Sequence, residues 1–245
     1  MKLTIKEDIL KEPLKMIKGL ISEANLITTE EGLEIVSWNK ANCAAVIYKV
    51  SKNLFTEYLP SEEKIGVSLV GITVNKKRRP GLVSILQKAM DGSFITIEED
   101  KGTLAITVNG RKYGMGVIAD ITAGDKFPDL KFKAVFNIET EQISDLVNDS
   151  FMSTEESMLF TFKENKLSVS YDEDLNTLKD SIEVSDVGEA EETHCRYSIS
   201  YLKVIVSKIT EKVRWSYGED YPLRLEYVAP EFSLTFLLAP RVPNT

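Results

Sequence analysis

The chain has 245 residues, of which 43% are hydrophobic and 28% are charged, and its formal net charge is −8 at pH 7. These values are typical of a globular protein with one large domain or two of ordinary size. No apolar run is long enough to span a membrane, and residues 1–10 are too charged for a signal peptide. We expect a cytoplasmic protein. The acidic charge argues against tight wrapping of nucleic acid, although it allows basic residues gathered on one face.

Residues that could carry catalysis or bind a metal are few. Cys43 and Cys195 lie far apart without a CxxC spacing, so we expect two reduced thiols and no zinc site. His194 is the only histidine, and adjacent strand residues point to opposite faces, so a joint site with Cys195 is not expected. Asp172 and Asp174 could serve an enzyme, but they lie in an acidic stretch without a third ligand, which favours a solvated turn. We expect no catalytic residue, metal or cofactor.

The first half of the chain alternates strands with two helices. A strand over residues 1–5 precedes a helix over 14–24, with Pro13 in its first turn, where proline is tolerated. A second, short helix is predicted over residues 82–90. Period-two alternation predicts strands over residues 26–28, 33–38, 44–50, 65–69, 94–98, 104–108 and 111–118.

After an irregular stretch at 119–130, the pattern restarts. Helices are predicted over residues 141–151 and 201–213. Strands are predicted over residues 132–136, 158–163, 166–171, 181–184, 196–200, 223–227 and 232–238. The two copies of this plan begin roughly 130 residues apart, as in a duplicated unit. The fold class is therefore α+β, with two like domains.

Cations gather around three of the four predicted helices, whereas the strand-rich remainder is acidic. A solvated helix face is the usual explanation of such lysines, but their presence in both halves favours a surface that faces duplex phosphates. No base-reading motif accompanies them, so sequence specificity is not expected. The predicted DNA-facing residues are Lys11, Lys15, Lys18, Lys76, Lys77, Arg78, Arg79, Lys88, Lys203, Lys208, Lys212 and Arg214.

Three stretches resemble one known family. They are the polar turn and strand at 217–227, the Leu-Ala-Pro-Arg tail at 238–241, and the pair formed by residues 20–24 and 31–33. The chain resembles, over essentially its whole length, the DNA sliding clamp (proliferating cell nuclear antigen) family of archaea and eukaryotes, and looks like an archaeal subunit. The resemblance implies domains at 1–118 and 132–245 joined by a connecting loop at 119–131. It also implies antiparallel sheets outside and two short helices per domain inside.

The family is a non-catalytic processivity factor in DNA replication and repair. The resemblance implies a homo- or heterotrimeric ring around double-stranded DNA. It also implies partners that dock by short peptides, namely DNA polymerase, flap endonuclease, DNA ligase and the clamp loader. The residues carried over to the peptide pocket are Trp38, Cys43, Ala45, Phe127, Pro128, Pro222, Leu238, Ala239 and Pro240. Those carried over to the subunit interface are Lys112, Tyr113, Met115, Val117, Leu178 and Ile182.

The chain departs from the family pattern in three places. The loop that starts at Trp38 lacks the usual Met-Asp, the predicted helix over 141–151 has acids where the family often has cations, and residues 70–81 form a longer link. A mixed ring of different subunits stays open beside a homotrimer. A monomeric acidic protein-interaction module without DNA binding is the alternative, but it leaves the helix cations unexplained.

Overall fold

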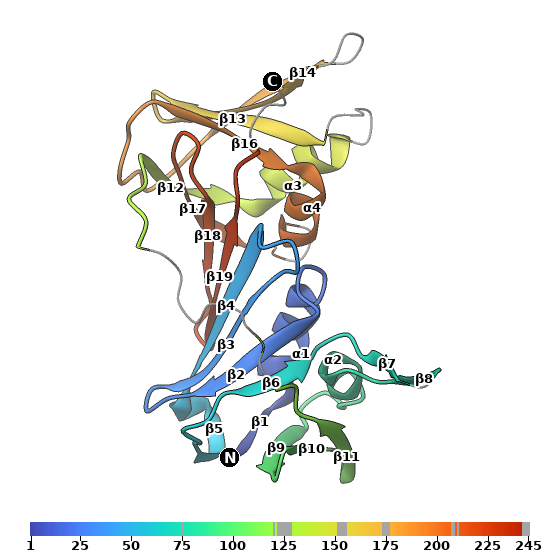
Figure 1. The fold of residues 1–245 in the computed structure, drawn as a ribbon. Coiled ribbons are helices and arrows are strands. Elements are labelled where there is room, and N and C mark those ends of the chain that lie inside the picture. Colours follow the sequence, from blue (N-terminus) through green and yellow to red (C-terminus); the bar gives the residue numbers. More distant parts are fainter. Residues whose placement is uncertain are drawn as a thin grey trace. The chain divides into compact units, whose positions relative to one another are not determined.

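The computed structural model describes residues 1–74, 76–119, 121, 129–150, 156–172, 177–206, 209 and 211–241. The chain divides into two compact units, which Figure 1 shows as ribbons of antiparallel strands with short helices. Unit 1 comprises Met1–Phe127 with Ala229–Leu234, and unit 2 comprises Pro128–Val228 with Thr235–Thr245. Strand β19 (Phe232–Leu238) contributes residues to both.

Unit 1 is built mainly from antiparallel strands. Their bounds are β1 Lys2–Lys6, β2 Glu23–Thr28, β3 Gly32–Trp38, β4 Ala44–Ser51, β5 Phe55–Leu59, β6 Ile65–Ser68, β9 Phe94–Asp100, β10 Thr103–Val108 and β11 Arg111–Gly116. A 3₁₀ turn, η1, spans Lys52–Leu54. One sheet has the order β11-β10-β9-β1-β5, and β4, β3, β2 and β6 pair in that order. Every strand predicted in this half is present.

Helix α1 spans Glu7–Ile17, so the prediction of a helix over 14–24 was wrong. Pro13 lies inside the helix, where it cannot donate a hydrogen bond to the carbonyl oxygen of Ile9. The buried hydroxyl of Tyr48 on β4 donates to that carbonyl instead. Burial raises the pKa of Tyr48 well above its ordinary value, so the hydroxyl keeps the proton that it donates. A tertiary contact therefore supplies the Ile9 carbonyl with the hydrogen-bond donor that Pro13 lacks.

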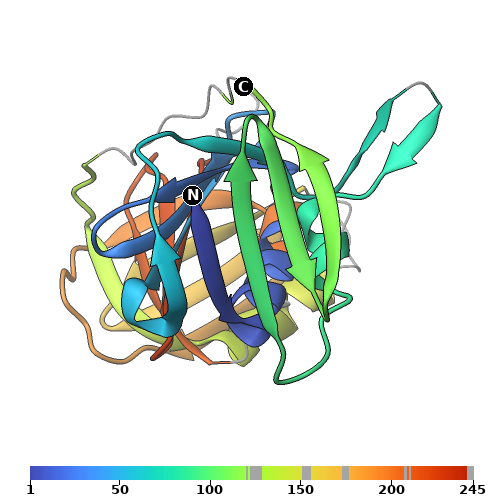
Figure 2. The ribbon, with the colours of Figure 1, turned by 90° about the horizontal axis from the view of Figure 1, so that it is seen from below.

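A two-stranded hairpin precedes the second helix of unit 1. Strands β7 (Ile72–Val74) and β8 (Lys77–Arg79) pair antiparallel, and helix α2 follows at Leu82–Leu86. Figure 2 shows the hairpin extending away from the sheets of unit 1. The sequence pattern did not predict these strands, and α2 is shorter than the predicted helix over 82–90.

Unit 2 repeats the antiparallel architecture. Its strands are β12 Ala134–Glu139, β13 Ser157–Lys163, β14 Lys166–Asp172, β15 Thr177–Glu183, β16 Thr193–Ser198, β17 Lys212–Tyr217 and β18 Leu223–Val228. One sheet has the order β15-β14-β13-β16, and β12, β17, β18 and β19 pair in that order. Aromatic rings fill the core: Phe136 stacks on Phe162 at 5.1 Å between centroids, and Phe160 lies 5.5 Å from Trp215.

The helices of unit 2 are α3 (Thr140–Asp149) and α4 (Ile199–Val206). The prediction of a helix over 201–213 was wrong at its end, because residues from Lys212 onward form β17. Val213, Trp215 and Tyr217 are buried and alternate with more exposed residues in the first half of that strand, which is a strand period. Because the apolar residues before Lys212 keep helical spacing, the sequence pattern did not show where the strand begins.

The two units share one order of elements: a strand, a helix, further strands, a second helix and three final strands. This duplicated α+β plan confirms the predicted fold class. The β7–β8 hairpin is the main difference among the described residues. Unit 2 passes directly from the end of β16 at Ser198 to the start of α4 at Ile199.

Candidate nucleic-acid interface and partner surfaces

The first of the predicted DNA-facing cations on α1 is held by other parts of unit 1. Lys11 Nζ donates to the carbonyl oxygen of Ala89 at 3.2 Å and lies 3.4 Å from Asp91 Oδ1. Its side chain is only 19% exposed. Lys11 therefore fastens α1 to the segment after α2. Lys88, in the same segment, is exposed, and its carbonyl oxygen accepts a hydrogen bond from the side chain of Asn109.

Three other cations on or next to helices are freer than Lys11 to contact a phosphate. Lys15 is exposed and pairs with Glu12, one turn away, at 3.0 Å. Such an exposed pair contributes little and can exchange for a phosphate. Lys18 caps the C-terminus of α1, and Lys203 lies in the last turn of α4; both are half-buried and make no ion pair with a described residue. Lys208 lies outside the described residues.

Lys212 and Arg214 lie on strand β17, not on a helix as predicted. Both side chains are exposed and alternate with buried residues, so they lie on the face of the strand opposite Trp215. Lys212 Nζ is 3.5 Å from Glu139 Oε1 and 3.2 Å from Ser185 Oγ. These two cations consequently do not lie on α4 beside Lys203.

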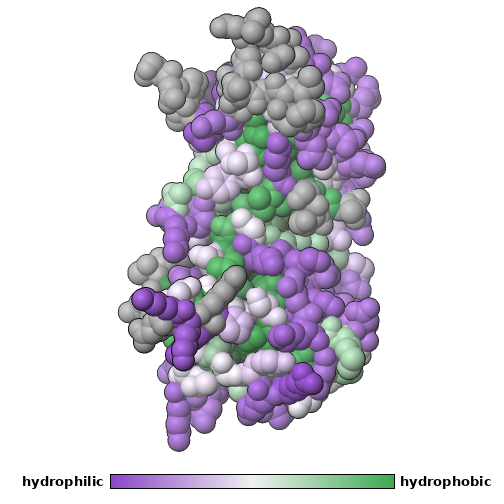
Figure 3. All heavy atoms as spheres, turned by 90° about the vertical axis from the view of Figure 1, so that its right-hand side faces the viewer, coloured by the Kyte–Doolittle hydropathy of each residue, from purple (hydrophilic) through white to green (hydrophobic). Residues whose placement is uncertain are grey.

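The run of cations Lys76–Arg79 also differs from its expected setting. It occupies strand β8 and the turn before it, with Lys76 in a left-handed conformation at φ 62°. Lys76, Lys77 and Arg79 are exposed and form no ion pair with a described residue. Figure 3 shows that hydrophilic residues cover most of the surface on the side of unit 1 that carries this hairpin and α2.

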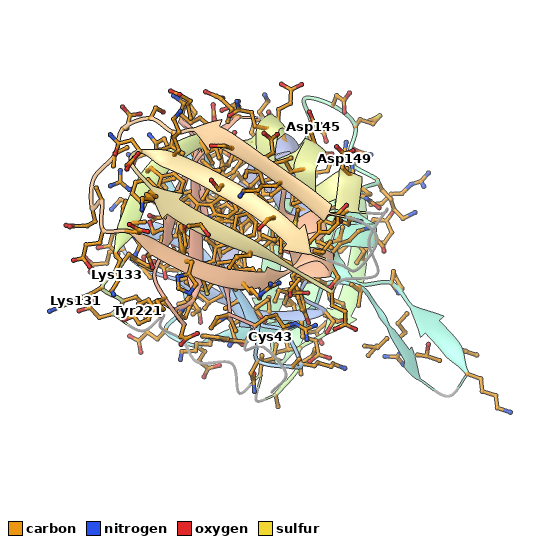
Figure 4. The ribbon with its side chains drawn as sticks, turned by 90° about the horizontal axis from the view of Figure 1, so that it is seen from above. Cys43, Lys131, Lys133, Asp145, Asp149 and Tyr221 are labelled. Carbon is orange, nitrogen blue, oxygen red and sulfur yellow. The ribbon has the colours of Figure 1, made fainter. Side chains whose placement is uncertain are left out.

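Helix α3 presents acids where α1 presents lysines. Gln142, Asp145 and Asp149 are exposed, and no lysine or arginine occurs in α3. Asp145 and Asp149 are four residues apart and so lie on one side of the helix (Figure 4). This agrees with the departure noted in the sequence, and α3 cannot attract phosphates as α1 can.

The residues predicted for the peptide pocket in unit 1 surround a closed turn. The Asn39 side-chain oxygen accepts hydrogen bonds from the backbone of Cys43 at 2.9 Å and Ala44 at 3.0 Å. This side-chain cap holds the loop in a fixed conformation. Trp38 and Cys43 are half-buried, whereas Ala45 is fully buried and offers no surface to a ligand in this structure.

The pocket residues of unit 2 likewise differ in exposure. Pro222, Ala239 and Pro240 are half-buried, whereas Leu238 is buried in β19. The tail is held by the backbone of Arg241, which donates to Arg196 at 2.7 Å. Phe127 and Pro128 lie outside the described residues. The assembly of these residues into one pocket stays a prediction.

The predicted subunit edges are end strands of their sheets. β11 closes one end of the five-stranded sheet, and β15 closes one end of the four-stranded sheet. An end strand leaves one row of backbone groups free to pair with another chain. Tyr113, Met115 and Val117 are half-buried, Lys112 pairs with Glu98 at 3.2 Å, and Ile182 is buried. The side chain of Leu178 lies outside the described part of the chain.

The described residues contain little that resembles a catalytic centre. His194 is exposed and Cys195 buried, which confirms that these neighbours on β16 point to opposite faces. Burial raises the pKa of the Cys195 thiol and so disfavours a reactive thiolate. In the described ranges no group of three or more His, Cys, Asp or Glu side chains could hold a metal ion. Asp174 of the acidic stretch lies outside them.

Comparison with known proteins gives a consistent result, although no family model matches the chain. The "DNA polymerase sliding clamp" of Thermococcus fumicolans is 28% identical over 235 residues, which cover 92% of each chain. The A. fulgidus PCNA, solved with the C-terminal region of FEN-1, gives a TM-score of 0.83 at 20% identity and covers 100% of this chain and 99% of its own. A chain of the PCNA2–PCNA3 complex from Sulfolobus tokodaii gives a TM-score of 0.80 at 18% identity, and the match covers 98% of this chain and 99% of that one.

The chain resembles the archaeal sliding clamps and has the clamp fold. The resemblance predicted from the C-terminal strand and tail is thereby confirmed over the whole length. In the part of this clamp-like chain that the structure describes, no helix is long and apolar enough to cross a membrane.

One cluster beside the predicted peptide pocket was not singled out from the sequence. The ring of Phe132 lies edge-on to Tyr221 at 5.9 Å, and the guanidinium of Arg224 lies 5.1 Å from the Phe132 centroid. Lys131 and Lys133 flank this ring and are exposed near Tyr221 (Figure 4). Alternating cations and one aromatic residue at 131–133 were the available signal, but the stretch was assigned to the connecting loop and a strand.

Proposed function

We propose that this protein is a DNA polymerase processivity factor: a ring-shaped sliding clamp that encircles duplex DNA and tethers replication and repair enzymes. The observation that carries the proposal is the match to archaeal sliding clamps over at least nine-tenths of the chain, together with the duplicated clamp fold. Nothing in the proposed function requires a catalytic group, so the protein acts by tethering other enzymes.

The phosphate-facing surface is assigned to lysines on or beside the helices, chiefly Lys15, Lys18 and Lys203. Lys15 is exposed and Lys18 and Lys203 are half-buried, and the one ion pair that they make with described residues is the exposed pair of Lys15 with Glu12. This setting suits weak and exchangeable contacts with phosphates. Such contacts do not depend on sequence and allow a ring to move along the duplex. Lys11 contributes less in this assignment, because Ala89 and Asp91 already hold its ammonium group.

The ring itself is assigned to edge pairing between subunits. We assign β11 of one subunit and β15 of the next to this contact, because each closes one end of its sheet. The Sulfolobus tokodaii complex, which contains PCNA2 and PCNA3, supports considering a mixed ring beside a homotrimer. Light scattering on the pure protein separates the two: a stable homotrimer by itself counts against an obligatory mixed ring.

Partner enzymes are assigned to the surface around Trp38, Cys43, Pro222 and the 239–240 tail. The A. fulgidus structure, which holds the C-terminal region of FEN-1, supports a short peptide as the docking element. Polymerase, flap endonuclease, ligase and clamp loader are the expected classes of partner. Lys131 and Lys133 would favour acidic residues next to such a peptide.

The test is stimulation of a DNA polymerase on primed circular DNA in the presence of a clamp loader. Charge reversal by Lys15→Glu, Lys18→Glu and Lys203→Glu should abolish most of the stimulation. A matched variant, Lys163→Glu, Lys52→Glu and Lys101→Glu, changes three exposed cations outside the assigned DNA-facing and partner-docking surfaces and should retain it. Equal stimulation by both variants would refute the DNA-facing assignment. A monomer without stimulation in any condition would favour the protein-interaction module.

A further inference from the structure

The β7–β8 hairpin is an addition to the repeated plan of the fold. In unit 1, 13 residues separate the end of β6 from the start of α2, whereas in unit 2 the corresponding strand runs directly into α4. The second helix of a unit can therefore form without such a hairpin. The extra residues must be explained by something other than the architecture of the repeat.

Close backbone contacts and hydrogen bonds fix the base of the hairpin. Gly71 has φ +89°, and a Cβ atom at Gly81 would lie 2.2 Å from the backbone nitrogen of Gly71 and 2.5 Å from the carbonyl oxygen of Leu69. The segments that enter and leave the hairpin, at Gly71 and Gly81, thus approach so closely that only glycine fits at position 81. Ser68 Oγ accepts a hydrogen bond from Gly71 N at 3.2 Å, and Val83 N donates to Leu69 at 3.2 Å. These contacts tie the hairpin to β6 and α2.

The hairpin concentrates positive charge, and three of its four cations pair with no carboxylate among the described residues. Residues 70–81 contain four consecutive cations and no acid, in a chain with a net charge of −8. Some exposed cations of unit 1, such as Lys15 and Lys112, pair with carboxylates at 3.0 and 3.2 Å. In contrast, Lys76, Lys77 and Arg79 have no carboxylate partner among the described residues.

The register places two of these cations together. Arg79 pairs with Ile72 across the hairpin, and Lys77 lies two residues away on the same strand, so both belong to one face of the ribbon. Ile72 is 42% exposed on that face. A short ribbon with cations along one face suits an extended polyanion better than a single small anion.

We propose that this hairpin is a second DNA-binding element, which contacts the phosphates of duplex DNA without requiring the ring to encircle it. A two-stranded β-ribbon fits the major groove of B-DNA, and lysine and arginine side chains then reach phosphates on its borders. An acidic peptide is a weaker fit, because strands of three residues offer few backbone hydrogen bonds for strand addition. The inference rests on the proposed function for the identity of the polyanion, since a clamp works on duplex DNA.

The proposal is tested with the full-length protein and a short, blunt, linear duplex, from which a ring can slide off. Binding is measured by fluorescence anisotropy over a series of salt concentrations, with two duplexes of unrelated sequence. The hairpin variant carries Lys76→Gln, Lys77→Gln and Arg79→Gln. Its matched control carries Lys40→Gln, Lys52→Gln and Lys101→Gln, which change the net charge equally and include one left-handed lysine, as the hairpin variant does.

The hairpin variant should bind both duplexes more weakly than the control, and the slope of log K against log salt should become shallower by about 2.7, at about 0.9 per lost phosphate contact. Equal slopes for the two variants would overturn the proposal. Loss of binding to polyglutamate with unchanged DNA binding would also overturn it, in favour of an acidic protein partner. Stimulation of polymerase on circular DNA tests the ring separately: hairpin-dependent binding without stimulation would refute the clamp function and leave the hairpin assignment standing.

Discussion

Helices α1 and α3 occupy the same position in the two units, each directly after the unit's first strand, yet only α1 carries lysines. Both bury one apolar side: Ile9, Leu10, Leu14 and Ile17 in α1, and Ile143, Leu146 and Val147 in α3. The buried spacing is shared because each helix must cover a sheet. Exposed positions are free of that requirement, so their charges differ between the copies.

The cores differ in a similar way. Unit 2 packs large aromatic rings against one another, whereas the described core of unit 1 is mostly aliphatic and has one fully buried ring, that of Tyr48. Cores of different composition can support one architecture if volume and pattern are kept. Core packing therefore maintains the same fold in both units. The hairpin, the α1 lysines and the α3 acids give the two units different surfaces.

The largest difference in stability between matched substitutions in the two units is expected at the base of the β7–β8 hairpin. Gly81→Ala should lower the free energy of unfolding by about 3 kcal/mol, because the new methyl group would overlap backbone atoms that cannot rotate away. The matched change in unit 2 is Gly188→Ala, whose Cβ would lie no nearer than 3.6 Å to its neighbours. It should cost no more than about 0.5 kcal/mol. Urea unfolding measures both, and equal costs would show that the close approach of Gly81 to Gly71 is not rigid.

The next largest effect on stability is expected at the proline in α1, a feature that α3 lacks. Tyr48→Phe removes the donor to the Ile9 carbonyl and should cost about 1–3 kcal/mol, the penalty of an unsatisfied buried group. In a Pro13→Ala background the alanine N–H can donate to Ile9, so the same substitution should cost about 1 kcal/mol less. A double-mutant cycle in urea measures this coupling. Additive costs would contradict the role given to the tyrosine hydroxyl.

Much of the fold followed from periodicity, and its errors have physical causes. The strand pattern and the duplication were predicted because alternation and repetition are local signals. The first helix was predicted too far along the chain because proline normally occurs in a first turn. Tyr48, which donates a hydrogen bond to the Ile9 carbonyl in place of residue 13, lies 39 residues away from Ile9 in sequence. The end of α4 was misplaced because apolar residues from 202 to 209 keep helical spacing up to the start of β17.

The candidate site was less predictable than the fold. Lysines could be counted from the sequence, but the partner of each could not: Lys11 is held by Asp91, 80 residues away, whereas Lys18 has no such carboxylate among the described residues. The hairpin strands are only three residues long, too short for alternation to be recognised. Ala45 and Leu238 were assigned to a pocket by resemblance, and position alone does not report burial.

The acids of α3 provide the mildest change and the most direct test of the asymmetry between the units. Asp145→Lys with Asp149→Lys would give α3 cations one turn apart, as α1 has in Lys11 and Lys15. If α3 faces the duplex, affinity for a short duplex at low salt should rise about fivefold, and the salt slope should steepen by about 1.8 for two added phosphate contacts. Glu62→Lys with Glu63→Lys is the matched control, because it makes the same charge change at exposed residues between β5 and β6. A control variant that gained as much would attribute the effect to net charge. If neither variant gained affinity, α3 would lie away from the phosphates.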